Sequence, residues 1–424
     1  MITGLAIILL LAALGMPLFA VIAAIALVGF HLAGIDLIAV AVEYYRLGDK
    51  PGLIAIPLFT LAGYLLGESG TPQRLVRLSL ALLGWLPGGL AIVAIIACAF
   101  FTAFTGASGM TIVAVGAFLY PALCKAGYPE RYSLGLVTSS GSLGLLFAPS
   151  LPLILYGFVA GQLSTTPPVT MKDLFLAGLL PGGLMVLMLS LHAMWIGRQI
   201  PKAATHINAG ELWAAVKDAK WELPLPFVVL GGIYSGKFAA SEAAAITTLY
   251  VLIVTVLIKK EIAFKKLPEL MAEAMRLVGA ILIILGAATA LSNWLVDQEV
   301  PTRLFAFSTQ HVHSGGMFLL LLNGVLLLVG MFMDIFSAIV ILTPLLVPVA
   351  VGYGINPIHF GIVMLANLQI GYFMPPAGMD LFIAAYRFKS NILTLTRACA
   401  PFFLIVGLAV LIITWWPWLS LALL

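Results

Sequence analysis

Residues 84–124 read GWLPGGLAIVAIIACAFFTAFTGASGMTIVAVGAFLYPALC, and this uncharged run decides the fold. It is too long for a single membrane-spanning helix, which needs roughly 20 residues. Phe104-Thr105-Gly106-Ala107-Ser108-Gly109 stands at its centre. Two half-helices that meet at this Gly-rich tip predict a re-entrant hairpin over about residues 88–124. Such backbone is tolerated at membrane depth only where it is buried in protein or lines a water-filled cavity.

The composition of the whole chain agrees with a lipid environment. Of the 424 residues, 62% are hydrophobic and 9% are charged, whereas a soluble domain carries about 25% charged residues. This composition excludes a soluble enzyme and predicts an all-α polytopic membrane protein in contact with lipid. Further uncharged runs long enough to span a bilayer cover residues 132–171, 277–296, 304–333, 335–379 and 398–424.

Several other classes of function find no support in the sequence. The three cysteines show no CxxC spacing, so neither a disulfide framework nor a zinc site is expected. There is no GxxxxGK[ST] motif for a nucleotide. The net charge of +4 is small, and the basic residues lie between apolar runs. This distribution is typical of a membrane protein and does not indicate nucleic-acid binding. We therefore expect no cofactor other than a coupling ion, and an ion gradient as the energy source.

The second half of the chain repeats the order of features in the first half at an offset of about 227 residues. For example, Leu86-Pro87-Gly88-Gly89 aligns with His313-Ser314-Gly315-Gly316. We predict a first repeat over residues 1–200, an interfacial linker over 201–226 and a second repeat over 227–424. The remaining elements are a broken helix at about 131–162, a second hairpin at about 315–352 and a second broken helix at about 356–387.

The distribution of positive charge predicts the orientation. Residues 1–35 contain no Lys or Arg, so Met1–Phe30 is interpreted as two retained membrane helices and not as a secretory signal. With both termini on the periplasmic side of a bacterial inner membrane, most of the 21 Lys and Arg residues fall on the cytoplasmic side. The two repeats then run in opposite directions. Inverted repeats with broken helices are typical of secondary transporters, whose binding site lies near the midplane.

The hairpin tips and helix breaks predict two cation sites. At the tips and breaks, carbonyl and hydroxyl oxygens are released from helical hydrogen bonding, and such oxygens suit a small hard cation. Asp334 is the single charged residue between 304 and 379, and a carboxylate in an apolar run is costly unless it is paired or functional. We predict two Na⁺ sites and no site for another metal. The first site consists of Thr105, Ser108, Gly144 and Pro149. The second consists of Gly330, Asp334, Met374 (through its backbone) and Gly378.

The substrate is expected between these two cation sites. Half-helix N-termini there would offer N–H groups to an anion, and nearby polar side chains could hydrogen-bond a carboxylate or hydroxyl group. The candidate substrate-binding residues are Ser139, Ser140, Gly141, Asn367 and Asp380. Alternative readings stay open for these features: small residues at the tip could serve close helix packing, and Ser139, Ser140 and Asn367 could join helices by hydrogen bonds.

A set of motifs in this order and spacing resembles the large membrane subunit of the tripartite ATP-independent periplasmic (TRAP) transporters over essentially the whole chain. The motifs are Gly15-Met16-Pro17, Ala55–Gly63, the Thr105–Ser108 tip, Gly141–Gly144 with Pro149-Ser150, Ser241–Ala245, and Asn356–Gly361 followed by Pro375-Pro376.

The resemblance implies a sodium-coupled importer with the ion-transporter-superfamily fold and an elevator mechanism. The hairpins and broken helices would form the moving transport domain, and the arms and outer spans would form the scaffold domain. It also implies a small four-helix membrane partner subunit and a periplasmic substrate-binding protein that delivers an organic anion. Sialic acids, C4-dicarboxylates, 2-oxo acids and sugar acids all remain possible substrates.

Two residues depart from the family pattern. The family usually has Ser at the position of Thr105, and this change keeps a hydroxyl group. It usually has Thr at the position of Met374, and this change removes a side-chain oxygen from the second cation site. Asp334 or backbone carbonyls would have to replace that oxygen, which leaves the number of coupled ions open.

The sequence therefore predicts the permease subunit of a sodium:organic-anion symporter, not an enzyme. The alternative is a single-component sodium:carboxylate symporter of the same fold, which would need no partner protein. An intramembrane enzyme would require a nucleophile–base pair or a metal cluster at depth, and no such motif is present in the sequence. A channel would not require two inverted hairpins.

Overall fold

The computed structural model describes residues 8, 10–12, 14–163, 165–200 and 209–424. This range is helical, with no strand among the described residues, so the prediction of an all-α fold is confirmed. Seven of the described helices are long and apolar enough to cross a membrane, or up to nine if each of two bent helix pairs counts as one span. The predictions for residues 1–7 and 201–208 lie outside the described residues.

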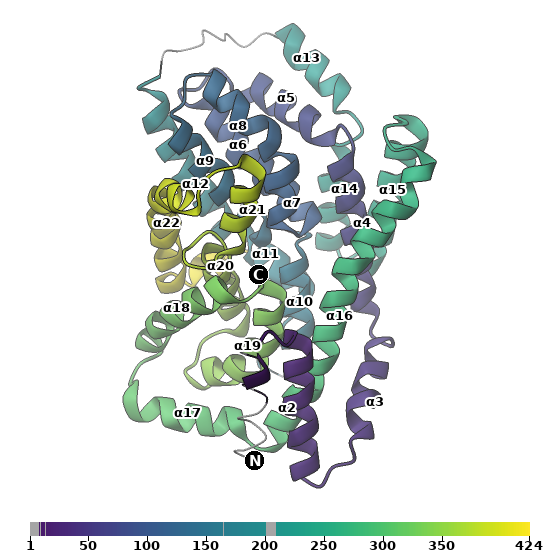
Figure 1. Ribbon diagram of the computed structural model, residues 1–424, viewed down its shortest axis with the longest axis vertical. Coiled ribbons are helices and arrows are strands. Elements are labelled where there is room, and N and C mark those ends of the chain that lie inside the picture. The colour runs from purple at the N-terminus through teal and green to yellow at the C-terminus, as the bar shows by residue number, and fades with distance from the viewer. Residues whose placement is uncertain (1–7, 9, 13, 164, 201–208) are drawn as a thin grey trace.

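The helices form two groups that lie side by side (Figure 1). We call the first group the column, and its helices pack on one another along α16 and α4. The column contains α2 (Leu18–Leu32), α3 (Ile38–Leu47), α4 (Ala55–Glu68), α14 (Pro224–Tyr234), α15 (Ala240–Leu252) and α16 (Leu267–Asp297). A π-helical segment, η3 (Ile253–Ile258), extends α15.

We call the second group the hairpin body. Its first half contains α6 (Gly89–Thr105), α7 (Ser108–Ala114), α8 (Gly116–Lys125), α9 (Glu130–Ser140), η2 (Leu143–Leu146), α10 (Leu151–Ala160), α11 (Met171–Ala177) and α12 (Leu179–Gly197). Its second half contains α18 (Gly315–Phe332), α19 (Ile335–Gly352), α20 (Pro357–Gly371), α21 (Met379–Phe388), α22 (Ile392–Trp415) and α23 (Trp418–Leu421).

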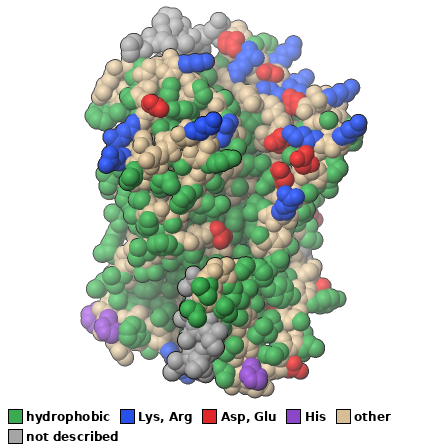
Figure 2. Space-filling model, viewed as in Figure 1, with side chains coloured by type: hydrophobic (Ala, Val, Ile, Leu, Met, Phe, Trp, Pro, Cys, Tyr) green, Lys and Arg blue, Asp and Glu red, His purple; other side chains and the backbone are tan. Residues whose placement is uncertain are grey.

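Three helices cross between the column and the hairpin body: α5 (Thr71–Leu83), α13 (Ala209–Asp218) and α17 (Val300–His311). Figure 1 shows α5 and α13 at one end of the molecule and α17 at the other. Figure 2 shows Lys, Arg, Asp and Glu gathered mainly over the end that holds α5 and α13, above a broad hydrophobic band. A band of this kind is the surface that a bilayer would cover.

Local sequence explains where the hairpin body bends. Gly106 ends α6 with φ +65°, a left-handed conformation that glycine adopts without strain. Asp334 caps α19 by accepting a hydrogen bond from the Ser337 N–H at 2.9 Å, and Asn356 caps α20 in the same way through the Ile358 N–H at 2.8 Å. Such caps satisfy N–H groups that have no partner within the helix.

The interrupted segments lie at the centre of the hairpin body. In the most apolar stretch of Glu130–Ala160, the span that contains α9, η2 and α10, 94% of the residues are buried within the protein, compared with 39% in Gly315–Phe332. Residues 141–150 and 372–378 interrupt their helices. Irregular backbone in a membrane protein must be shielded from lipid because its polar groups have no other partners there. The burial of the first break meets that requirement.

Candidate functional site

The first hairpin tip carries a cluster of buried hydroxyl groups. The Thr102 hydroxyl donates to the Gly141 carbonyl at 2.6 Å and lies 2.5 Å from the Thr111 hydroxyl. Thr105, at the tip itself, is fully buried. Its hydroxyl makes two long contacts with Ala107: it donates to the carbonyl at 3.4 Å and accepts from the N–H at 3.5 Å. The tip of the first hairpin is therefore joined to the first helix break through side-chain and carbonyl oxygens.

One hydrogen bond from this tip reaches the second half of the chain. The Ser108 hydroxyl donates to Asp380 Oδ1 at 2.7 Å, and α7 lies beside α21 (Figure 1). Asp380 has no exposed surface, and its Oδ2 atom has no hydrogen-bond partner among the described residues. The structure thus brings together one predicted ion-site residue and one predicted substrate-site residue, and leaves a buried carboxylate oxygen available.

The first helix break packs its glycines directly on the hairpin. A Cβ atom on Gly144 would lie 2.2 Å from the Ala99 carbonyl oxygen of α6, so only glycine fits there. Pro149 lies in the same break, before α10. The Ser139 hydroxyl bonds back to the Gly135 carbonyl at 2.7 Å, whereas the buried Ser140 hydroxyl has no partner in the described part of the chain.

The second hairpin tip is held by Asp334 and Tyr372. Asp334 accepts from both the N–H and the hydroxyl of Ser337, and the Ile335 N–H donates to the Tyr372 hydroxyl at 2.6 Å. A Cβ on Gly371 would lie 2.4 Å from the carbonyl carbon of Gly330. The second tip and the second break therefore cross at backbone contact distance, through two glycines.

Three carbonyl oxygens converge at the second break. A Cβ on Gly378 would lie 2.5 Å from the Met374 oxygen, 2.6 Å from the Tyr372 oxygen and 2.9 Å from the Gly371 oxygen. Each of these carbonyls accepts one backbone hydrogen bond, and a carbonyl oxygen has a second lone pair. The Met374 side chain supplies no oxygen to the predicted second cation site, but these backbone oxygens lie beside it.

Asn367 belongs to a separate polar network. Its Nδ2 donates to Asn323 Oδ1 at 2.7 Å and to the Val363 carbonyl at 2.8 Å, and Asn323 in turn donates to Thr414 at 3.1 Å. The network joins α18, α20 and α22. One part of Asn367, the Oδ1 atom, is buried without a partner among the described residues.

The sequence analysis did not single out Thr102, Thr111 or Tyr372, nor the Gly371 carbonyl. A signal for the two threonines was present: Thr102 lies one helical turn before Thr105, and Thr111 lies one turn after Ser108. Hydroxyl groups on one face of each half-helix would have predicted the cluster. Nothing in the sequence indicated that Tyr372 reaches the opposite tip, because that contact depends on the tertiary crossing.

The chemistry of these crossings is that of hard oxygen donors. Within the described residues, no group of three or more His, Cys, Asp or Glu side chains could hold a metal ion. The groups that converge are carbonyls, hydroxyls and one carboxylate oxygen, which suit alkali cations better than transition metals.

The chain matches one protein-family model over residues 5–419, the DctM component of the tripartite ATP-independent periplasmic transporters. It is 32% identical over 406 residues to the C4-dicarboxylate TRAP transporter large permease protein DctM of Rhodobacter capsulatus, covering 93% of this chain and 91% of the relative. It is 29% identical over 415 residues to the ectoine TRAP transporter large permease protein TeaC of Halomonas elongata, covering 96% and 95%.

Two further matches concern chain length and fold. The isethionate TRAP transporter permease protein DctMQ of Oleidesulfovibrio alaskensis is 35% identical over 368 residues, which cover 86% of this chain and 57% of that protein. The crystal structure of the Alcanivorax borkumensis YdaH transporter superposes with a TM-score of 0.57 at 17% identity, over 89% of this chain and 87% of that one. At this identity the likeness concerns the fold alone.

The family model matches nearly the whole chain, and the sequence identity to the DctM relative extends over nearly the full length of both proteins. Together these matches identify the family of the polytopic helical chain described above. The chain belongs to the DctM family, the large membrane permease subunits of the tripartite ATP-independent periplasmic transporters.

Proposed function

We propose that this permease couples the entry of Na⁺ to the import of an organic anion, a carboxylate or sugar acid, by an elevator-type movement of the hairpin body against the column. The observation that carries the proposal is the pair of crossings between hairpin tips and helix breaks. One crossing presents Ser108 with the free oxygen of Asp380, and the other presents three carbonyls around Gly378.

The charge of the crossings supports cation coupling. Between Gly89 and Cys124, between Tyr132 and Ala160, and between Gly315 and Tyr386, Asp334 and Asp380 are the only Asp, Glu, Lys or Arg residues. An anion that entered this region alone would meet carboxylates and no fixed positive side chain. Transfer of an uncompensated charge out of water is strongly unfavourable. Bound cations therefore have to accompany the substrate.

We place the two cation sites on the residues at each crossing. The first consists of oxygens from Thr105, Ser108 and the Gly144–Pro149 break, and the second of backbone oxygens near Gly330, Met374 and Gly378. The substrate lies between them, near Ser140, Gly141 and Asp380. Asp334 acts on the second site through the cap that shapes the tip, or as a ligand itself. Asn367 acts mainly by joining helices, and the Ser139 hydroxyl is engaged by a carbonyl within its own helix.

The relatives indicate the range of substrates and partners. Their printed names specify C4-dicarboxylate, isethionate, ectoine and 2,3-diketo-L-gulonate. The longer DctMQ relative supports a second, small membrane component beside the large permease. We propose a bacterial inner-membrane assembly of this chain with such a subunit and with a periplasmic substrate-binding protein, both chain termini being periplasmic.

Reconstitution of the permease with the small subunit in proteoliposomes tests this function. With a radiolabelled C4-dicarboxylate or sugar acid loaded on its binding protein, an inward Na⁺ gradient should drive accumulation, and an equal K⁺ gradient should not. Uptake that proceeds equally without Na⁺ would contradict sodium coupling. Uptake of free substrate without the binding protein would favour the single-component symporter instead.

A further inference from the structure

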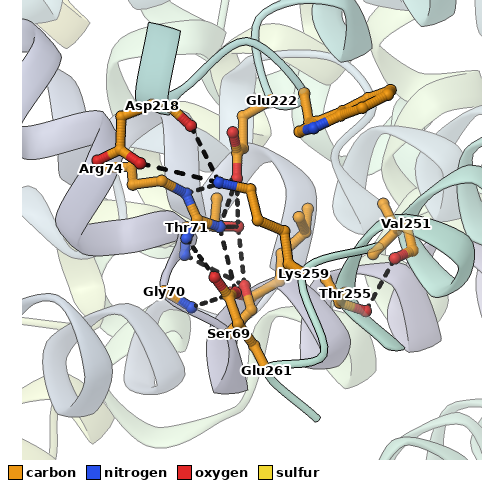
Figure 3. Close-up of polar contacts among 12 residues, drawn as sticks. Ser69, Gly70, Thr71, Arg74, Asp218, Glu222, Val251, Thr255, Lys259 and Glu261 are labelled. Atoms are coloured by element: carbon orange, nitrogen blue, oxygen red, sulfur yellow. Dashed lines mark hydrogen bonds and ion pairs between the residues drawn. The ribbon is translucent and has the colours of Figure 1, made fainter. Parts of the chain in front are cut away.

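A buried arginine lies at the charged end of the molecule, outside the proposed transport site (Figure 3). Arg74, in the first turn of α5, is 8% exposed and lies between two carboxylates. Its Nε donates to Glu222 Oε1 at 2.7 Å. Its Nη1 and Nη2 atoms bond the two oxygens of Glu261. The planar guanidinium thus holds one carboxylate from each of two distant parts of the chain.

The turn before α5 is built around the same carboxylates. The Gly70 N–H donates to Glu261 Oε2 at 2.9 Å, and the Ser69 hydroxyl donates to the Thr71 hydroxyl at 2.8 Å. A Cβ on Gly70 would lie 2.7 Å from Arg74 Nη1, so the arginine closes over the turn. Glu261 therefore fixes both the backbone and a side chain at the start of α5.

Three chain corners meet at Arg74. They are the turn between α4 and α5, the segment between α13 and α14 that carries Glu222, and the link between α15 and α16 that carries Glu261. Lys259, in that same link, donates to the Asp218 carbonyl at 3.2 Å, as Figure 3 shows. The cluster thus ties the start of α5 and the end of α13 to the end of the column.

The two crossing helices α5 and α13 also bind each other. Leu78, Ala215 and Ala219 form a small apolar cluster between them. One turn along α5 from Arg74, Arg77 pairs with Glu211 at 2.9 Å and with Asp218 at 3.4 Å, but its side chain is 46% exposed. The Arg77 pairs are therefore surface ion pairs, which contribute little, whereas the Arg74 cluster is buried.

The charges in the cluster are mutually stabilised. Burial alone would lower the pKa of Arg74, but its hydrogen bonds and ion pairs with Glu261 and Glu222 outweigh burial and raise it. Burial alone would raise the pKa of Glu261, yet Arg74, the Gly70 N–H and Lys259 together lower it. Arg74 and Glu261 are therefore both charged at neutral pH. Buried ion pairs contribute less stability than apolar packing of the same volume would, but they can fix one geometry among alternatives.

The opposite end of the molecule lacks such a cluster. There the crossing helix α17 takes part in no ion pair among the described residues. α5 itself packs against α6 of the hairpin body, a contact that has to slide if the body moves. At the far end of α5, a Cβ on Gly88, whose φ is +78°, would lie 2.3 Å from the Ala193 carbonyl oxygen of α12. The turn 84–87 therefore lies between a point fixed on the column and a point fixed on the hairpin body.

We propose that Arg74 is a positioning residue that fastens α5 and α13 to the column, so that these two helices stay with it while the hairpin body moves about the turn 84–87. The movement itself rests on the elevator-type function proposed above; the fastening does not. Arg74 touches neither the ions nor the substrate, and acts by holding the crossing helices in one position.

Distance measurements between spin labels test the fastening directly. In a full-length background with Cys98, Cys124 and Cys399 replaced by Ser or Ala, labels at Trp213→Cys on α13 and at Phe264→Cys, just before α16 of the column, occupy exposed positions. We expect a narrow distance distribution that is the same with and without Na⁺. Arg74→Gln should broaden it, Arg74→Lys should broaden it less, and the matched control Arg77→Gln should leave it unchanged.

A second label pair separates the two proposals. Labels at Phe264→Cys and at Tyr386→Cys, both exposed positions, measure the distance between the column and α21 of the hairpin body. This distance should change when Na⁺ and substrate-loaded binding protein are added. If this distance never changes, the elevator function fails, while the first pair still tests the fastening. An unchanged first-pair distribution in Arg74→Gln overturns the fastening whatever the second pair shows.

Transport and ion binding together distinguish positioning from a general loss of structure. Arg74→Gln should reduce Na⁺-driven uptake by roughly tenfold, while ²²Na⁺ binding, measured at a temperature at which both proteins are folded, stays close to that of the parent protein. Its melting temperature should fall, because two carboxylates lose their buried partner. Loss of sodium binding in parallel with uptake would overturn the proposal, because it would indicate a purely structural role. If Arg74→Gln does not fold, Glu261→Gln serves instead. It keeps an acceptor for the Gly70 N–H, and the first-pair distribution must broaden in it for the proposal to stand.

Discussion

At the residue scale, the two carboxylates near the crossings, Asp334 and Asp380, have different surroundings. Asp380 is fully buried, receives one hydroxyl from Ser108 and keeps one oxygen without a partner among the described residues. Asp334 is partly exposed, and both of its carboxylate oxygens accept hydrogen bonds from Ser337, at the start of α19. A carboxylate with an available oxygen is a candidate ligand, and one with its oxygens engaged is first of all a helix cap.

Two substitutions of Asp334 separate a cap from a ligand. Asp334→Asn keeps a side-chain oxygen for the Ser337 N–H, so its stability should equal that of the parent protein, whereas Asp334→Ala should lose about 1 kcal/mol. If Asp334 is only a cap, Asp334→Asn retains sodium-dependent uptake. Thermal melting and uptake, measured on both variants, check this. A parent-like melt with abolished uptake in Asp334→Asn would assign it instead as an ion ligand.

The Glu261 carboxylate gives the Arg74 cluster a defined pH dependence. Its pKa lies below the ordinary value of 4.5, since Arg74, Lys259 and the Gly70 N–H outweigh the effect of burial. A group whose pKa is lowered by folding stabilises the protein above its unfolded pKa, and that contribution is lost as pH falls through the folded value. The parent protein should therefore melt above Glu261→Gln at neutral pH, and the difference should shrink below pH 4.5. A difference that stays constant or grows on acidification would contradict this.

At the scale of elements, close backbone crossings hold the tips on the breaks. Gly330 and Gly371 approach each other so closely that a Cβ on either would meet backbone atoms of the other segment at 3.2 Å or less. Gly144 meets α6 in a comparable way. Such contacts leave no room for side chains, so the position of each tip depends on glycine in two segments at once.

Alanine at Gly371 should therefore displace the second tip. The added methyl would lie 2.4 Å from the Gly330 carbonyl carbon, and overpacking of this kind costs about 1–3 kcal/mol. Gly324→Ala is the matched control, because it lies on the same helix as Gly330 with nothing within 4 Å of its Cβ position. Melting temperature and sodium-dependent uptake should fall in Gly371→Ala and not in Gly324→Ala. Equal values in the two variants would contradict the tight crossing.

The sequence allowed the all-helical membrane fold to be predicted because that depends on uncharged runs and Gly-rich interruptions, which are local features. It also indicated Ser108 and Asp380 as candidates, but in different sites. The bond between them joins residues of the two halves, and no local pattern encodes such a contact. The same holds for Tyr372, which reaches the opposite tip, and for Arg74, whose partners come from the linker and from the link after α15.

At the scale of the whole molecule, the ion-pair clusters lie apart from the oxygen-rich crossings. Ionised side chains gather at the end that holds α5 and α13 (Figure 2). There the buried pairs of Arg74 tie these helices to the column, and the surface pair of Arg77 joins them to each other. The hairpin body carries apolar helices and the oxygen-rich crossings, where the carboxylates are Asp334 and Asp380. We infer that one part of the protein is fastened by charge, and that the other is free of fixed positive charge where the cations and the anion would meet.

Equilibrium binding of ²²Na⁺ to the purified permease, without its partners, tests the central claim most directly. The account predicts saturable binding that K⁺ does not displace, and that weakens by at least about tenfold in Ser108→Ala and in Asp380→Asn, since hydrogen bonds to a charged group contribute about 1.5–3 kcal/mol. Asp49→Asn, which changes an exposed carboxylate outside the hairpin body, should bind as the parent protein does. Absence of saturable Na⁺ binding, or equal affinity in all four proteins, would contradict it.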